Sequence, residues 1–138
     1  MPLIPAKPVL ELVVPGKPLP YKKKRWHPKP QQEQMDSIAA YARKWGPPAP
    51  LDGALAVEVL CAFRVPKSVS QREAKLRLAG DAWHTQTPDS TNLLKLVEDS
   101  LTGIVWHDDS QAAFSACKKR WVDEGAGFTR IKVWQLPL

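Results

Sequence analysis

The chain has 138 residues and a net charge of +6, from 20 Lys and Arg against 14 Asp and Glu. This length suits one domain with one core, and the 43% of hydrophobic residues exclude a disordered tail. No apolar run approaches the ~20 residues that span a bilayer, and prolines interrupt the apolar N-terminus. We therefore expect no signal peptide, no membrane association and a cytoplasmic location, with Cys61 and Cys117 as reduced core residues.

The first 50 residues contain eleven of the 14 prolines, which disfavours long helices over residues 1–30. Residues 9–14 alternate in part between apolar and polar and predict a first strand. A basic, proline-rich loop follows at about residues 15–30. Residues 31–45 have neither proline nor glycine, and their apolar residues recur at helical spacing, so they predict a helix.

The second half of the chain continues the alternation of elements. Residues 54–65 favour a strand whose second face is only half polar, which fits a central strand. A short basic helix follows, which Ser68 or Ser70 can cap and Gly80 can end. A helix over residues 91–102 stops before Gly103, a position suited to a left-handed C-terminal cap. Residues 111–122 and 127–136 predict two more strands, joined by a turn.

The predicted order β-α-β-α-α-β-β indicates one α/β (α+β) domain over residues 1–138. We expect a mixed sheet of about four strands with two to three helices.

Three basic clusters are each followed directly by a tryptophan: "YKKKRW", "ARKW" and "KKRW". Cationic side chains can bind phosphates and flat rings can stack on bases, so this pattern favours nucleic-acid binding. The alternative is a solvated basic face with its tryptophans turned inward. The residues predicted to bind DNA are Lys22, Lys23, Lys24, Arg25, Lys118, Lys119 and Arg120.

Carboxylates flank the helix predicted at residues 91–102. Asp89 precedes it, Asp108 and Asp109 follow it, and Lys95 and Asp99 face each other on its polar side. Helix caps, an ordinary turn and an ordinary ion pair would explain these residues. A Mg²⁺ site that acts on a phosphodiester would explain them too, since magnesium prefers a few carboxylates and water.

The stretch "PDSTNLLKLVEDSLTGIVWHDDSQ" resembles the signature of RusA-type Holliday junction resolvases. That family has D-x-D-N-L-x-K, an aspartate four residues after the lysine, and then D-D. The positions that match are Asp89, Asn92, Leu93, Lys95, Asp99, Asp108 and Asp109. The specific matches lie within residues 84–111, and the order of elements is compatible over most of the chain.

The resemblance implies a small bacterial or phage-encoded homodimer that cuts four-way DNA junctions symmetrically with Mg²⁺. It implies that Asp89, Lys95 and Asp109 are catalytic and that Asp89 and Asp109 bind the metal. We expect Asp108, or alternatively Asp99, to complete the metal site. Thr91 departs from the pattern, because the family has an aspartate there and a hydroxyl is a weak magnesium ligand. Two alternatives therefore remain: a weakened or inactive junction-binding protein of the same fold, and a basic nucleic-acid-binding module without catalysis.

Overall fold

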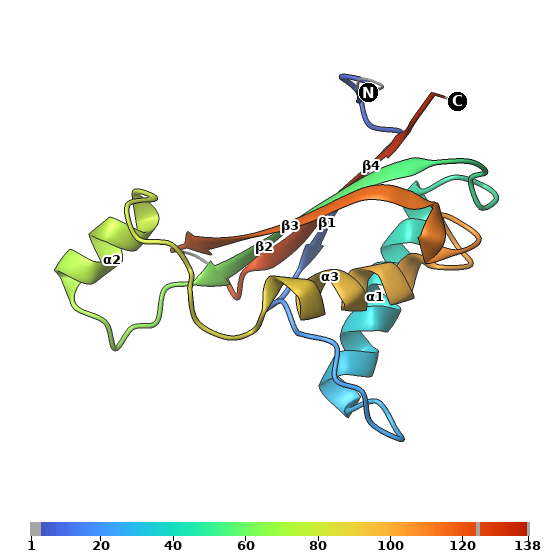
Figure 1. Cartoon of the computed structure of the whole chain (residues 1–138). Coiled ribbons are helices and arrows are strands. Elements are labelled where there is room, and N and C mark those ends of the chain that lie inside the picture. Colours follow the sequence, from blue (N-terminus) through green and yellow to red (C-terminus); the bar gives the residue numbers. More distant parts are fainter. Residues whose placement is uncertain (1–3, 124, 138) are drawn as a thin grey trace.

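The computed structural model describes residues 4–123 and 125–137 (Figure 1). Its elements are β1 (Leu10–Pro15), α1 (Lys29–Trp45), β2 (Leu55–Arg64), α2 (Gln71–Leu78), α3 (Ser90–Leu101), a 3₁₀ turn η1 (Asp109–Gln111), β3 (Ala112–Val122) and β4 (Phe128–Gln135). The predicted order is confirmed, with η1 as an addition. The turn predicted between β3 and β4 includes Glu124, which lies outside the described residues.

The strands form one mixed sheet in the order β1-β4-β2-β3. β2 is central, as its only half-polar second face predicts: it pairs with β3 in parallel and with β4 in antiparallel orientation. β1 pairs with β4 in antiparallel orientation and forms the other edge. The α+β fold class with four strands and three helices is confirmed.

Helices α1 and α3 cover one face of the sheet, whereas α2 stands beyond one end of it (Figure 1). Ile38 of α1 and Val97 of α3 pack with Val57 and Ile131 of the sheet in a shared buried core. Trp106 is fully buried, and its Nε1 donates a hydrogen bond to the Thr102 hydroxyl (3.0 Å). Because Trp106 is fixed there, the segment after α3 stays near the C-terminal end of that helix.

The helix ends follow the sequence signals. Ser70 caps α2 by accepting a hydrogen bond from the Glu73 backbone N–H (3.1 Å). Gly80 and Gly103 have φ of +82° and +88°, the left-handed region predicted for these positions. α1 begins two residues earlier than predicted, because Pro30 lies in its first turn, where proline's missing N–H removes no helical hydrogen bond.

Candidate active site along helix α3

Asp89 is the N-cap residue of α3, yet its side chain makes no capping hydrogen bond. It is exposed and has an extended backbone (φ −70°, ψ 143°). The capping alternative required this carboxylate to accept a hydrogen bond from a backbone N–H of α3. The carboxylate accepts no such bond. Thr91, also exposed, lies in the first turn of the same helix.

Lys119 of β3 holds the segment that leads into Asp89. Its ammonium donates to the backbone carbonyl of Gln86 (2.7 Å) and to that of Pro88 (3.1 Å). The Thr87–Pro88 peptide bond is cis. The strand thus fixes the backbone one residue before the carboxylate, although 30 residues separate Lys119 from Asp89 in the sequence.

The middle of α3 presents the predicted ion pair. Lys95 Nζ lies 3.6 Å from an oxygen of Asp99, and about half of the lysine side chain is exposed. The same ammonium lies 4.8 Å from the centre of the Tyr21 ring. The Tyr21 backbone N–H donates to the Asn92 carbonyl (2.9 Å), which fastens the start of the basic loop to α3.

The second acidic segment lies at the other end of α3. Asp108 caps η1: its carboxylate accepts from the Ser110 backbone N–H (2.9 Å), and the side-chain oxygen of Gln111 accepts from the Asp108 backbone N–H (3.0 Å). The hydrogen bonds from Ser110, the backbone N–H first, hold the pKa of Asp108 below its usual value. Burial raises the pKa of Glu98, and the negative charges of Asp109 and Asp99 raise it further.

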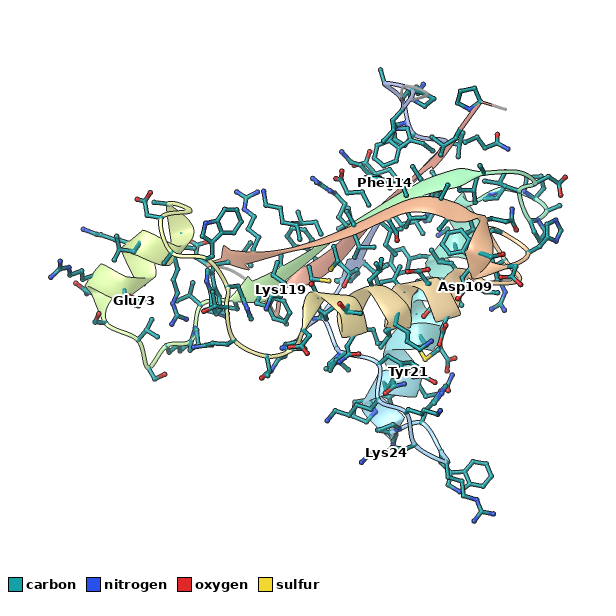
Figure 2. The ribbon with its side chains drawn as sticks, viewed as in Figure 1. Tyr21, Lys24, Glu73, Asp109, Phe114 and Lys119 are labelled. Carbon is teal, nitrogen blue, oxygen red and sulfur yellow. The ribbon has the colours of Figure 1, made fainter. Side chains whose placement is uncertain are left out.

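The described part of one chain does not bring together the three carboxylates that the sequence predicts as metal ligands. α3 has 12 residues, so its ends are ~18 Å apart at 1.5 Å per residue. Figure 2 shows Asp109 near the end of α3 and Lys119, which holds the Asp89 segment, near its start. Within the described parts of the chain, no three His, Cys, Asp or Glu side chains gather as a metal-binding group. Asp89 is thus separated from Asp108 and Asp109, and Asp108 serves η1 as a cap.

The basic loop between β1 and α1 carries an exposed cationic surface. Two glutamines of α1 hold its backbone: Gln31 accepts from the Lys22 N–H (2.9 Å) and Gln34 from the Leu19 N–H (2.8 Å). The side chains of residues 22–25 remain exposed, and Figure 2 shows Lys24 on a loop that projects away from the sheet. Trp26 is 77% exposed beside Arg25, which suits a ring that stacks on bases.

The basic run on β3 is divided between the two faces of its strand. Lys118 and Arg120 are exposed, whereas Lys119 points to the other side and binds backbone carbonyls. Lys119 is therefore a structural cation, and Lys118 and Arg120 are the residues of this cluster that remain available to DNA. The tryptophans divide as well: Trp45 is 64% exposed, but Trp121 is buried.

His84 and Trp121 line the cavity beside Asp89. The sequence singled out Trp121 only as the tryptophan of a basic cluster and assigned no role to His84. His84 stacks on Trp121 with ring centres 4.3 Å apart and contacts Phe63 at 4.4 Å. Burial, and then the Lys119 charge, lower the pKa of His84, so this imidazole is neutral at pH 7. Only its position in the segment that leads to Asp89 could have drawn attention to it.

Comparison with known families identifies one family that covers most of the chain. A family model described as endodeoxyribonuclease RusA matches residues 15–133, which include the basic loop, α3 and both acidic segments. A comparison with curated proteins found no match. No helix in the described part of the chain is long and apolar enough to cross a membrane. Because the family model covers most of the chain, this protein belongs to the RusA family of Holliday junction endodeoxyribonucleases.

Proposed function

We propose that this chain is a magnesium-dependent endonuclease that makes paired cuts in four-way DNA junctions as a homodimer in the cytoplasm. The observation that carries the proposal is Asp89: an exposed carboxylate, free of capping bonds, on a backbone that Lys119 holds in place. Such fixed placement is what a reacting phosphate needs, because positioning supplies much of the catalysis of phosphoryl chemistry.

Lys95 is the residue that we assign to the phosphate itself. Its pairing with Asp99 is long and half exposed, so it costs little to turn the ammonium toward a new anion. A positioned donor near the transition state can be worth ~3 kcal/mol. Lys22, Lys23, Lys24 and Arg25, with Lys118 and Arg120, are the surface that we assign to the DNA arms.

The metal requires a different arrangement from the one that the sequence suggested. Two ligands of one Mg²⁺ each lie ~2.1 Å from it, far closer together than the ~18 Å length of α3 allows for Asp89 and Asp109. We infer that a second copy of the chain brings its acidic segment to Asp89. A homodimer also suits the substrate, since two symmetric cuts need two sites related by a two-fold axis.

Thr91 supports a second candidate function, a junction-binding protein with weak or no catalysis. The family pattern has aspartate at this position, and Thr91 is exposed in the first turn of α3, where a carboxylate would have stood beside Asp89. Losing one negative charge weakens the attraction of a divalent cation.

One experiment separates these candidates. A labelled four-way junction and a duplex of the same arm sequence are incubated with the wild type, Asp89→Asn and Asp109→Asn, with and without Mg²⁺. The endonuclease proposal expects symmetric cuts in the junction only, requiring Mg²⁺ and absent from both variants, with junction binding retained. Preferential junction binding with no cutting by the wild type would establish the second candidate. Equal binding to junction and duplex would contradict both.

A further inference from the structure

A cavity of about 790 Å³ opens beside Asp89 and has no role in the proposed cleavage of DNA. It lies between residues 17–22 of the basic loop, the end of β2, the segment before α3 and the end of β3. Asp89 and Asn92 form part of its wall, so its contents would lie against the candidate catalytic carboxylate. Its volume falls within the range of small-molecule sites.

The walls of the cavity are aromatic and apolar. Tyr21, Phe63, His84 and Trp121 line it, together with several prolines. Tyr21 joins the cavity to the catalytic helix, because its ring lies under the Lys95 ammonium. Flat aromatic walls favour a flat, uncharged ligand that can stack on them.

The rim of the cavity has the opposite character. Lys17, Lys22, Arg64 and Lys67 are exposed at its edge, and among the described residues that line it Asp89 is the one carboxylate. The cavity therefore suits a molecule with a flat apolar part and an anionic part, which is the chemistry of a nucleotide.

Two of the side chains that line the cavity each contain a buried polar atom without a partner. The Nδ1 of His84 and the Nε1 of Trp121 are buried without a hydrogen bond within the described structure, and their residues are 7% and 6% exposed. A buried polar atom without a partner costs ~1–3 kcal/mol, so such atoms need an explanation. The edge of a nucleobase offers the donors and acceptors that these two rings lack, after small adjustments of the rings.

We propose that the cavity binds one unstacked nucleobase of the strand whose phosphate lies against Asp89. Taking a base out of a duplex costs a few kcal/mol, and least where pairing is already disturbed. The branch point of a junction is such a place. The cavity would thus help to restrict cutting to branched DNA. This inference rests on the proposed endonuclease function.

Photocrosslinking tests the proposal directly. 5-Iodo-deoxyuridine, which crosslinks to nearby aromatic rings, is placed singly at each position around the branch point. The protein is bound to the junction without Mg²⁺, irradiated and mapped by mass spectrometry. We expect one or two positions next to the branch point to crosslink to Tyr21, Phe63, His84 or Trp121. Crosslinks found only at exposed Trp26, Trp45 or Trp83, or none at any position, would overturn the proposal.

A variant in which a large side chain fills the cavity provides a second test of the proposal. Ala126 lines the cavity and lies outside the core, so Ala126→Trp can fill the cavity without removing a core contact. Ala40→Trp, on the exposed side of α1, is the matched control. We expect Ala126→Trp to bind the junction but lose the cavity crosslink, and Ala40→Trp to keep it. Lys67→Trp at the rim serves if Ala126→Trp does not fold.

The two failures are distinguishable. A cavity crosslink that persists in a folded, filled variant would refute the base-binding site and leave the endonuclease proposal intact. Equal binding of junction and duplex by the wild type would instead remove the proposed function on which this inference rests.

Discussion

Mixed dimers of two inactive variants should recover activity that neither variant has alone. Asp89→Asn and Asp109→Asn each remove one carboxylate, and we expect each purified variant to bind junctions without cutting them. The structure puts these carboxylates at opposite ends of a 12-residue helix, ~18 Å long, whereas two ligands of one Mg²⁺ must lie within ~4 Å of each other. If each site takes Asp89 from one chain and Asp109 from the other, a mixed dimer has one intact site and one site with both defects.

The expected size of the recovery follows from random assembly. When equal amounts of the two variants are unfolded and refolded together, about half of the dimers are mixed, so about a quarter of all sites are intact. The assay is nicking of a labelled four-way junction, because one intact site cuts one strand. Differently tagged chains, purified in tandem, confirm that mixed dimers have formed.

The outcome that contradicts this reasoning is equally definite. If both carboxylates belonged to a site within one chain, every site in a mixed dimer would carry one defect. Tandem-purified mixed dimers that cut no faster than either parent would then refute a site shared between chains. A mixture of wild type and Asp89→Asn is the positive control, since it retains intact sites under either arrangement.

Four further outcomes are expected. Thr91→Asp should strengthen Mg²⁺ binding and raise cleavage, with a larger metal-induced rise in melting temperature; unchanged titration and melting would place residue 91 away from the metal. Lys119→Met should lower the free energy of unfolding by about 2 kcal/mol and slow cleavage, because the backbone carbonyls of Gln86 and Pro88 lose their donor. The control Lys118→Met, at an exposed position, should change it by less than about 0.5 kcal/mol, and equal denaturation midpoints for the two variants would contradict the prediction. Replacing Lys22, Lys23, Lys24 and Arg25 together should flatten the dependence of junction affinity on salt, by ~0.9 in log–log slope for each phosphate that the loop no longer neutralises; an unchanged slope would make this loop a solvated surface. Glu98→Gln should raise the melting temperature at pH 7 but not at pH 4, because a glutamate whose pKa is raised in the folded protein loses stability as pH rises above its ordinary pKa of 4.5. A difference in melting temperature between the variant and the wild type that stays constant from pH 4 to pH 7 would contradict this cause.

The elements of the fold were predictable because each depends on local signals. Short stretches of sequence were enough to predict these elements. The signals are the apolar spacing in α3, the serine before α2 and the only half-polar second face of β2. The contacts around Asp89 were not predictable in this way. Lys119 and Gln86 are 33 residues apart, and only the pairing of β3 beside β2 brings the strand close to that segment. The same pairing turns Trp121 inward, although its sequence context matches that of exposed Trp26 and Trp45.

The length of the predicted helix already indicated that the acidic residues before and after it lie apart. Their separation changes how the motif is interpreted. A 12-residue helix is ~18 Å long, so Asp109 could approach Asp89 only if the following segment turned back along α3. The segment does not turn back. Trp106 is buried with its Nε1 on Thr102, its carbonyl accepts from the Gly103 N–H (2.7 Å), and the Val105 carbonyl accepts from the Leu51 N–H (2.7 Å). These bonds hold Asp108 and Asp109 at the far end of the helix. If the proposed endonuclease function holds, the motif provides one half-site at each end of α3, and a two-fold assembly is the simplest way in which one half-site can meet the other.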